Sequence, residues 1–178
     1  MRVRRVVTGH DGDGKAVFAS DEQVEALTLA LIPGAEFHRL WGADQAPTFP
    51  DDGSPTAQHA YFPPVGGYRF GIFTIPPATA SVPADLDLQA ALAEMEEKLP
   101  GLLAYLERDN PGMHTTDTID FEVVLSGELI LELDDGVEKV LRPGDTVVQN
   151  GTRHRWGNRG TEPVVVAVFL IGAYRASE

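Results

Sequence analysis

The segment from residue 118 to residue 171 constrains the fold most, because short β-prone runs alternate there with tight glycine turns. An Asp-Gly pair between β-formers is a strong hairpin signal, and Asp135-Gly136 provides one. Many short strands at close spacing predict an antiparallel sandwich or barrel. We expect strands at residues 118–125, 129–133, 138–141, 146–149, 154–156 and 164–171.

The N-terminal part of the chain adds further strands to this mainly β fold. Residues 2–8 and 15–20 predict a hairpin around a glycine-rich turn. Residues 28–32 and 36–41 predict two strands that Pro33-Gly34 separates. Another strand is expected at residues 68–75, after a long irregular stretch rich in proline, aspartate and glycine.

A single stretch, residues 85–108, has the apolar spacing of three and four residues that predicts a helix. Pro100-Gly101 interrupts it, and a short second helix is expected at residues 102–106. The length of 178 residues predicts one domain over residues 1–178. Its parts are an N-terminal strand extension (1–41), a long loop (42–67), a barrel core (68–77 and 114–172) and a helical insertion (78–113).

Composition excludes several classes of function. A formal net charge of −13 repels nucleic-acid phosphates and anionic membranes, so we expect neither as a partner. The chain has no cysteine, which excludes disulfides, thiolate metal sites and a cysteine nucleophile. The N-terminal basic residues precede no apolar run of signal-peptide length, and no stretch approaches a membrane span of about 20 apolar residues. We expect a cytoplasmic protein.

Ionisable side chains share one face of the expected strand at residues 118–125. Because side chains alternate along a strand, Asp120 and Glu122 lie on one face, and Phe121 and Val123 lie on the other. The second face is wholly apolar, and we expect it to be buried. The carboxylates either lie on a solvated face or point into the interior of a barrel, where Glu122 is a candidate proton shuttle.

Residues 143–158 contain a Pro-Gly-Asp turn followed by Gly, His and Asn, namely Pro143-Gly144-Asp145, Gly151, His154 and Asn158. This pattern resembles the second of two short motifs of the cupin family. The resemblance covers about residues 67–171, with residues 78–113 as an insertion. It implies a stand-alone antiparallel jelly-roll β-barrel, without naming the reaction, because cupins host many chemistries.

The first cupin motif matches in part. Counting back from Gly127, its carboxylate falls on Asp120, its first histidine on His114 and its second histidine on Thr116. The resemblance implies a divalent metal ion (Zn, Fe, Mn or Ni) held by His114, Asp120 and His154, with open positions for substrate or water. The alternative is a metal-free barrel in which the two histidines act as acid and base, or only bind a ligand.

Four further residues are candidate substrate contacts. Arg69 is suited to hold a carboxylate bidentately, and Trp156 is suited to wall a ring. Gln149 and Thr116 are candidate groups of the pocket wall. The long loop is a candidate lid or interface arm, and its His59 reaches the site only if the loop closes over the barrel mouth.

Two classes of function fit this pattern. The first is a metal-dependent cupin enzyme with lyase- or isomerase-type chemistry (decarboxylation, dehydration or cyclisation) on an oxygen-rich small molecule, in which Glu122, His114 and His154 move protons. An Fe(II)-dependent dioxygenase is its alternative. The second class is a ligand-binding barrel without turnover. The resemblance also implies a role in secondary metabolism and a homodimer formed through the N-terminal strands at residues 2–20.

Overall fold

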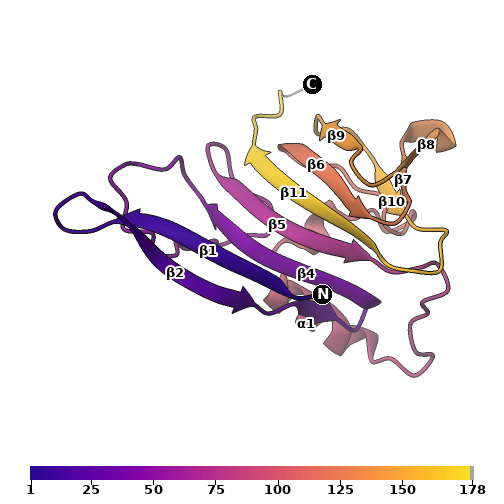
Figure 1. Cartoon of the computed structure of the whole chain (residues 1–178). Coiled ribbons are helices and arrows are strands. Elements are labelled where there is room, and N and C mark those ends of the chain that lie inside the picture. Colours follow the sequence, from indigo (N-terminus) through magenta and orange to yellow (C-terminus); the bar gives the residue numbers. More distant parts are fainter. Residues whose placement is uncertain (177–178) are drawn as a thin grey trace.

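The computed structural model describes residues 1–176, and the strands of this part of the chain form three antiparallel sheets (Figure 1). The largest has six strands in the order β3 (Leu27–Leu29), β4 (Ile32–Ala43), β5 (Tyr68–Ile75), β11 (Val164–Gly172), β6 (Thr118–Ser126) and β9 (Thr146–Gln149). The second has three, in the order β10 (Arg155–Gly157), β7 (Leu129–Glu132) and β8 (Glu138–Leu141). The predicted mainly β, antiparallel jelly roll is confirmed.

The core lies between the six-stranded sheet and the elements that pack on one side of it. Strand β11 shows why: every second residue from Val164 to Leu170 is buried, as expected for an alternating strand with one interior face. At one end, Val164 and Val166 pack with Leu129 of β7. At the other end, Val168 and Leu170 belong to the apolar cluster that includes the helical insertion. We call this side of the sheet the inner face.

The insertion contains helix α1 (Leu88–Lys98) and the short 3-10 helix η1 (Leu102–Tyr105). The Asp87 carboxylate caps α1 by accepting a hydrogen bond from the Ala90 N–H at 3.0 Å. Met95 turns inward from α1 and packs with the inner-face cluster. Helix α1 begins three residues later than predicted, after the Asp87 cap. The predicted interruption at Pro100-Gly101 is confirmed, because the chain turns at Gly101, whose positive φ of 78° does not fit an α-helix. Another 3-10 turn, η2 (Asp134–Gly136), joins β7 to β8.

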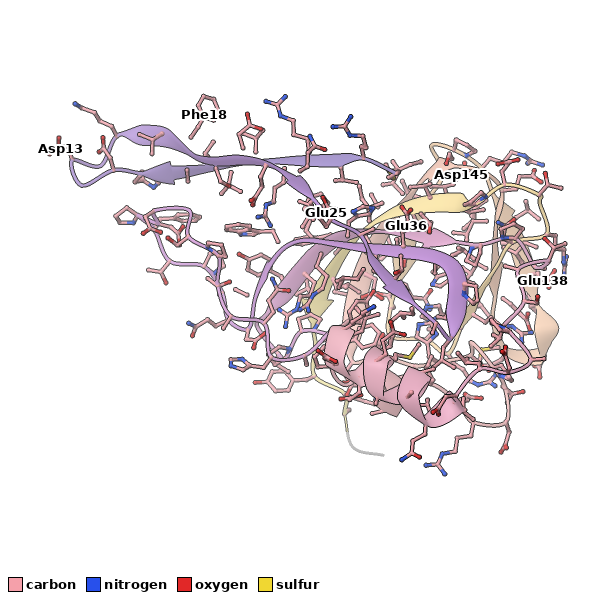
Figure 2. All side chains as sticks on the ribbon, turned by 90° about the horizontal axis from the view of Figure 1, so that it is seen from below. Asp13, Phe18, Glu25, Glu36, Glu138 and Asp145 are labelled. Atoms are coloured by element: carbon pink, nitrogen blue, oxygen red, sulfur yellow. The ribbon has the colours of Figure 1, made fainter. Side chains whose placement is uncertain are left out.

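Strands β1 (Val3–His10) and β2 (Ala16–Val24) form the predicted hairpin, and they pair only with each other. Figure 2 shows this arm projecting from the body, with Asp13 at its tip and Phe18 pointing away from the ribbon. Its base is fixed by Arg5, which donates to the Leu40 carbonyl at 2.6 Å and stacks over Trp41.

The predicted break at Pro33-Gly34 is wrong, because β4 runs through it without interruption. The pairing of β3 with β4 is irregular between Leu27 and Leu29, and this irregularity accommodates the proline and the positive φ of Gly34. Among the residues that the structure describes, none of the helices has the length and apolar character needed to cross a membrane.

Candidate functional site

The inner face of β6 carries the two carboxylates that the sequence singles out. Asp120 and Glu122 are only 3% and 4% exposed. The strand register places Asp120 opposite Leu170 of β11 and Gln149 of β9, and it places Glu122 opposite Val168. Directly paired residues of neighbouring strands share a face, so both carboxylates belong to the largely apolar inner face rather than to a solvated one.

The other face of β6 contradicts the sequence prediction of burial. Phe121 is 42% exposed, and Val123 and Leu125 are exposed as well. Within residues 1–176, both α1 and the three-stranded sheet pack on the inner face, which leaves these apolar side chains on the outside. An apolar pattern predicts that a strand face is buried, but it does not say whether elements of the same chain bury it.

Burial makes both inner carboxyl groups weaker acids than an exposed carboxyl group. It raises the pKa of Asp120 to about 6, against an opposing effect of the Thr118 hydroxyl. Burial, together with the charge of Asp120, raises the pKa of Glu122 to about 8. Asp120 Oδ1 and Glu122 Oε2 are buried without a hydrogen-bond partner in the described part of the chain. At neutral pH, Asp120 is therefore mainly ionised and Glu122 mainly protonated.

The two predicted histidines lie side by side. Their backbones form an isolated antiparallel bridge, in which each N–H donates to the other carbonyl at 2.9 Å, and their ring centroids are 4.1 Å apart. Nδ1 of His114 lies 3.1 Å from the Gly112 carbonyl, and Nδ1 of His154 lies 2.9 Å from the Thr152 carbonyl. Because a carbonyl only accepts, each Nδ1 carries the ring proton and each Nε2 keeps its lone pair.

Both imidazoles are neutral at physiological pH. Burial lowers the pKa of His114, against a smaller opposing effect of the Gly112 carbonyl. Burial, with a contribution from the neighbouring His114, lowers the pKa of His154 to about 4. Trp156 packs its ring edge-on against His154, with centroids 5.2 Å apart. The histidine pair is therefore a set of two uncharged nitrogen donors beside an aromatic wall.

The donor types suit a divalent ion, because imidazole nitrogens and carboxylates are ligands of Zn, Fe, Mn and Ni. Their arrangement does not: in residues 1–176, no three histidine, aspartate or glutamate side chains lie close enough together to hold one ion. The structure unites His114 with His154, but it does not gather both of them with Asp120 around one point. As they stand, the side chains do not fit a three-ligand ion, and this metal site stays a prediction.

Two of the predicted substrate contacts, Thr116 and Gln149, form hydrogen bonds within the protein. The fully buried Thr116 accepts a hydrogen bond from the Thr118 hydroxyl at 2.8 Å. The side-chain amide of Gln149 donates to both the carbonyl and the hydroxyl oxygen of Thr152. Gln149 thus fixes the turn that leads to His154, and a direct role of Gln149, Thr116 or the half-buried Trp156 in substrate binding stays a prediction.

All five N–H groups of the Arg69 guanidinium donate hydrogen bonds to other groups of the protein. It forms an ion pair with Asp44, and it donates to the backbone carbonyls of Ala43, Ala60 and Tyr68. At 4% exposure, it fastens the long loop to β5. The prediction that Arg69 binds a substrate carboxylate gains no support from these contacts.

The long loop covers part of the inner face. Tyr61 and Phe62 pack against the core cluster there, and Tyr61 meets Phe37 edge-on with ring centroids 6.3 Å apart. His59, by contrast, is 83% exposed in its side chain and pairs with Asp44 at 2.6 Å. The loop therefore brings Tyr61 rather than His59 to the interior.

Sequence reasoning missed Arg39, a half-buried arginine on β4. It stands opposite Gly71 on β5, which in turn stands opposite Val168. A small cavity of about 30 Å³ is lined by residues that include Arg39, Gln58, Tyr61, Gly71 and Val168. The alternation of Phe37 with Arg39 in the expected strand at residues 36–41 was the available signal, because it places both on one face.

A second hollow shares Trp41 and Phe70 with this cavity. It has a volume of about 990 Å³ and is lined by the hairpin arm, by the first part of the long loop and by the outer face of the large sheet. Trp41, Phe49, Phe70 and Phe169 are among its apolar lining residues. We call it the outer groove. It contains none of the ionisable groups predicted from the sequence to carry chemistry, apart from the surface histidine His59.

An antiparallel jelly roll with Asp120 on an inner strand and His114 bridged to His154 is the arrangement expected of the cupin class. The family model described as "Cupin domain" matches residues 106–171. The chain is 31% identical over 139 residues to "Oryzines biosynthesis cluster protein J" of Aspergillus oryzae, covering 69% of this chain and 78% of the relative. The protein belongs to the cupin superfamily, whose members commonly bind a divalent metal.

Two other relatives cover more of the chain. "Phomopsin biosynthesis cluster protein C'" of Diaporthe leptostromiformis is 30% identical over 156 residues, covering 87% of this chain and 70% of the relative. "Cupin-domain-containing oxidoreductase fogC" of Aspergillus ruber is 29% identical over 175 residues, covering 91% of this chain and 68% of the relative.

Proposed function

We propose that this cupin is a small-molecule enzyme of secondary metabolism that transfers protons, with lyase- or isomerase-type chemistry on an oxygen-rich substrate. The observation that carries the proposal is the carboxyl pair on the inner face of β6. Two adjacent carboxyl groups with pKa values pushed apart, about 6 for Asp120 and about 8 for Glu122, supply a base and an acid at the same pH.

The proposed roles of the two carboxyl groups follow from these protonation states. Asp120, mainly ionised at neutral pH, accepts a proton from a carbon next to a substrate carbonyl. Glu122, mainly protonated, donates its proton to the oxygen on which negative charge develops, or to a leaving hydroxyl. The neighbouring Val168 and Leu170 limit access of water, which preserves both pKa shifts. The predicted catalytic roles of His114 and His154 would add neutral proton acceptors to this pair.

The relatives support the biological setting of the proposal. Two of them are named as products of biosynthesis clusters, and both match over more than two thirds of this chain. The oxidoreductase name of the Aspergillus ruber relative favours a second candidate function, an oxidation of the same kind of substrate. The two candidates differ in one measurable respect, because only the oxidation consumes an oxidant.

The test is hydrogen exchange in D2O with three carbonyl acids that each have one carboxylate: acetoacetate, pyruvate and phenylpyruvate. Proton transfer predicts faster deuterium incorporation next to the carbonyl with the wild type than with Asp120→Asn or Glu122→Gln, measured by proton NMR. Glu128→Gln, at the exposed turn after β6, serves as the control variant. Oxygen uptake measured in parallel identifies the oxidative alternative. Exchange at the same rate in all four proteins would contradict the proton-transfer proposal.

We also propose that two copies associate through the hairpin arm and the outer face of the large sheet. Phe18 on the arm is 80% exposed, and the outer groove beside the arm has an apolar floor that includes Phe70 and Phe169. Adjoining exposed apolar residues are typical of a binding surface. A second copy covers both features at once, since arm and groove belong to the same chain.

A further inference from the structure

Arg39 and Glu122 stand at two positions of one row across the large sheet. The register aligns Arg39 with Gly71, Gly71 with Val168, and Val168 with Glu122. Because directly paired residues share a face, both ionisable side chains emerge on the inner face. Between them lie a residue without a side chain and an apolar valine, so the row has a cationic position, an apolar middle and an acidic position.

Positive charge exceeds negative charge around Arg39. Its pKa is lowered by burial and by the neighbouring Arg69, although a guanidinium keeps its charge in proteins. Among residues 1–176, the one carboxylate that acts on it noticeably is Asp44, which is already paired with Arg69 and His59. In the described part of the chain, Arg39 forms no ion pair, and its side chain donates one hydrogen bond, to Gln58 at 3.1 Å.

Tyr61 provides a second donor beside this arginine. Burial raises the pKa of its hydroxyl, so the group stays protonated and can donate a hydrogen bond. Tyr61 and Arg39 line the same small cavity, and the charges of Arg39, Asp120 and Glu122 all act on the Tyr61 hydroxyl. Within residues 1–176 the hydroxyl has no hydrogen-bond partner, so its donor is available to a ligand.

Gln58 orients the guanidinium rather than neutralising it. Its amide oxygen accepts from Arg39, while its amide nitrogen donates to the Gly42 carbonyl at 3.3 Å. The cavity that these side chains line, about 30 Å³, has room for about two water molecules, which is the space that a carboxylate group fills. Phe37, Phe73 and Leu170 also line it and give it apolar walls.

We propose that Arg39 and Tyr61 form the binding site for the carboxylate of a small organic acid. The guanidinium and the phenol donate hydrogen bonds to the carboxylate oxygens, and the apolar walls contact the carbon skeleton. The proposal of this binding site does not depend on the proposed reaction. That the rest of the ligand extends along the row toward Glu122 rests on the proposed function, because it would bring a carbon of the acid to the carboxyl pair. The substrate class is therefore a monocarboxylic acid.

The net charge of −13 makes this binding site testable, because the rest of the surface repels anions. The probes are sodium acetate and sodium benzoate, each compared with its neutral amide, in nitrogen-15 NMR titrations of the 178-residue chain at constant ionic strength. We expect saturable binding of at least one acid, at least tenfold tighter than binding of its amide, with shifts centred on residues 39, 58, 61 and 71. Tenfold corresponds to about 1.4 kcal/mol.

Three variants assign this preference to its residues. Arg39→Gln should abolish the preference of acid over amide, and Tyr61→Phe should weaken acid binding severalfold while the fold is kept. Arg142→Gln, which removes an exposed arginine paired with Glu128 at the surface, should leave binding unchanged. Equal binding of acid and amide, absence of binding by both acids, or an undiminished preference in a folded Arg39→Gln protein would overturn the proposal.

The binding experiment tests the anion site and the exchange experiment tests the proposed reaction, so either can fail without the other. Carboxylate binding that depends on Arg39, without any deuterium exchange, would support the anion site and count against the proposed reaction. Exchange that depends on Glu122, with carboxylate binding unaffected in Arg39→Gln, would support the reaction and overturn the anion site.

Discussion

Glu122 and Asp120 share the buried inner face of β6, two residues apart, and each keeps one carboxylate oxygen without a hydrogen-bond partner in the described chain. Two acidic groups in this position cannot both be ionised cheaply, because burial disfavours the charged form and the second charge repels the first. The pair is retained at the expense of stability, which is typical of groups that serve a function.

We first predict that Glu122→Gln stabilises the protein at high pH. The pKa of this carboxyl rises from 4.5 in the unfolded chain to about 8 in the folded protein, so the folded state binds the extra proton. The contribution of Glu122 to stability is therefore lost as pH rises from 4.5 through 8, and Asp120 adds a loss of the same sign between 3.8 and about 6. At pH 9 the variant should exceed the wild type by about 2–4 kcal/mol in urea unfolding.

The comparison is made at pH 5, 7 and 9. At pH 5 the difference should be small, since Glu122 is protonated in the folded wild type and Gln resembles the neutral acid. Glu128→Gln should show no such divergence, because Glu128 is exposed. A stability difference that is the same at all three pH values would rule out a buried titration of Glu122.

The second prediction concerns His154, whose pKa is lowered from 6.5 to about 4 by burial and by His114. Here the unfolded chain takes up the proton first, so the contribution of His154 to stability is lost as pH falls from 6.5 through 4, with the sign opposite to that of Glu122. Nitrogen-15 NMR of the imidazole rings should show His154 protonated at Nδ1 and still neutral at pH 5. An imidazolium signal of His154 at pH 6 would contradict the prediction.

The third prediction tests the metal site expected from the first and second cupin motifs. If His114, Asp120 and His154 hold an ion, elemental analysis of protein purified without chelators or an affinity tag should find close to one divalent ion per chain. The double variant His114→Ala/His154→Ala should lose it, and His59→Ala, which removes an exposed histidine, should not. Equal metal content in wild type and double variant would refute this set of ligands.

The fourth prediction is that Arg69 stabilises the fold rather than a bound substrate. Arg69→Met breaks the ion pair with Asp44 and leaves the Ala43 and Ala60 carbonyls without their donor. Removal of one partner of a buried pair costs about 3–5 kcal/mol. We expect a loss of this order in thermal or urea unfolding, together with faster proteolysis within residues 44–60. Unchanged stability with weakened carboxylate binding would instead assign Arg69 to the ligand.

The fifth prediction tests association of two copies. Phe18→Asp places a charge on the arm where the second copy is proposed to pack, and analytical ultracentrifugation should show a shift from dimer to monomer. Val137→Asp is the matched control, because Val137 is an exposed valine in the turn between β7 and β8, on a different sheet from the arm. A wild-type protein that sediments as a monomer at all concentrations would refute the proposal.

Local patterns determined most of the secondary structure. Alternation of apolar residues from Val164 to Leu170 and the glycine turns at Gly127 and Gly136 were sufficient to place the strands around them, because period-two patterns and positive φ angles are local properties. The predicted break at Pro33-Gly34 failed for the opposite reason. The irregular pairing of β3 with β4 accommodates Pro33 and Gly34 between the paired residues Ile32 and Phe37, and the sequence pattern contains no sign of this tertiary pairing.

The sequence by itself also determined that Asp120 and Glu122 share one face of a strand and that His114 and His154 occupy cupin motif positions. The tertiary structure alone decided that the carboxylate face is buried and the apolar face exposed, because burial depends on which elements pack on a sheet. It also decided that Arg39 and Glu122 stand in one row. That relationship needs the register of four strands, and residues 83 positions apart in the chain contain no local signal of it.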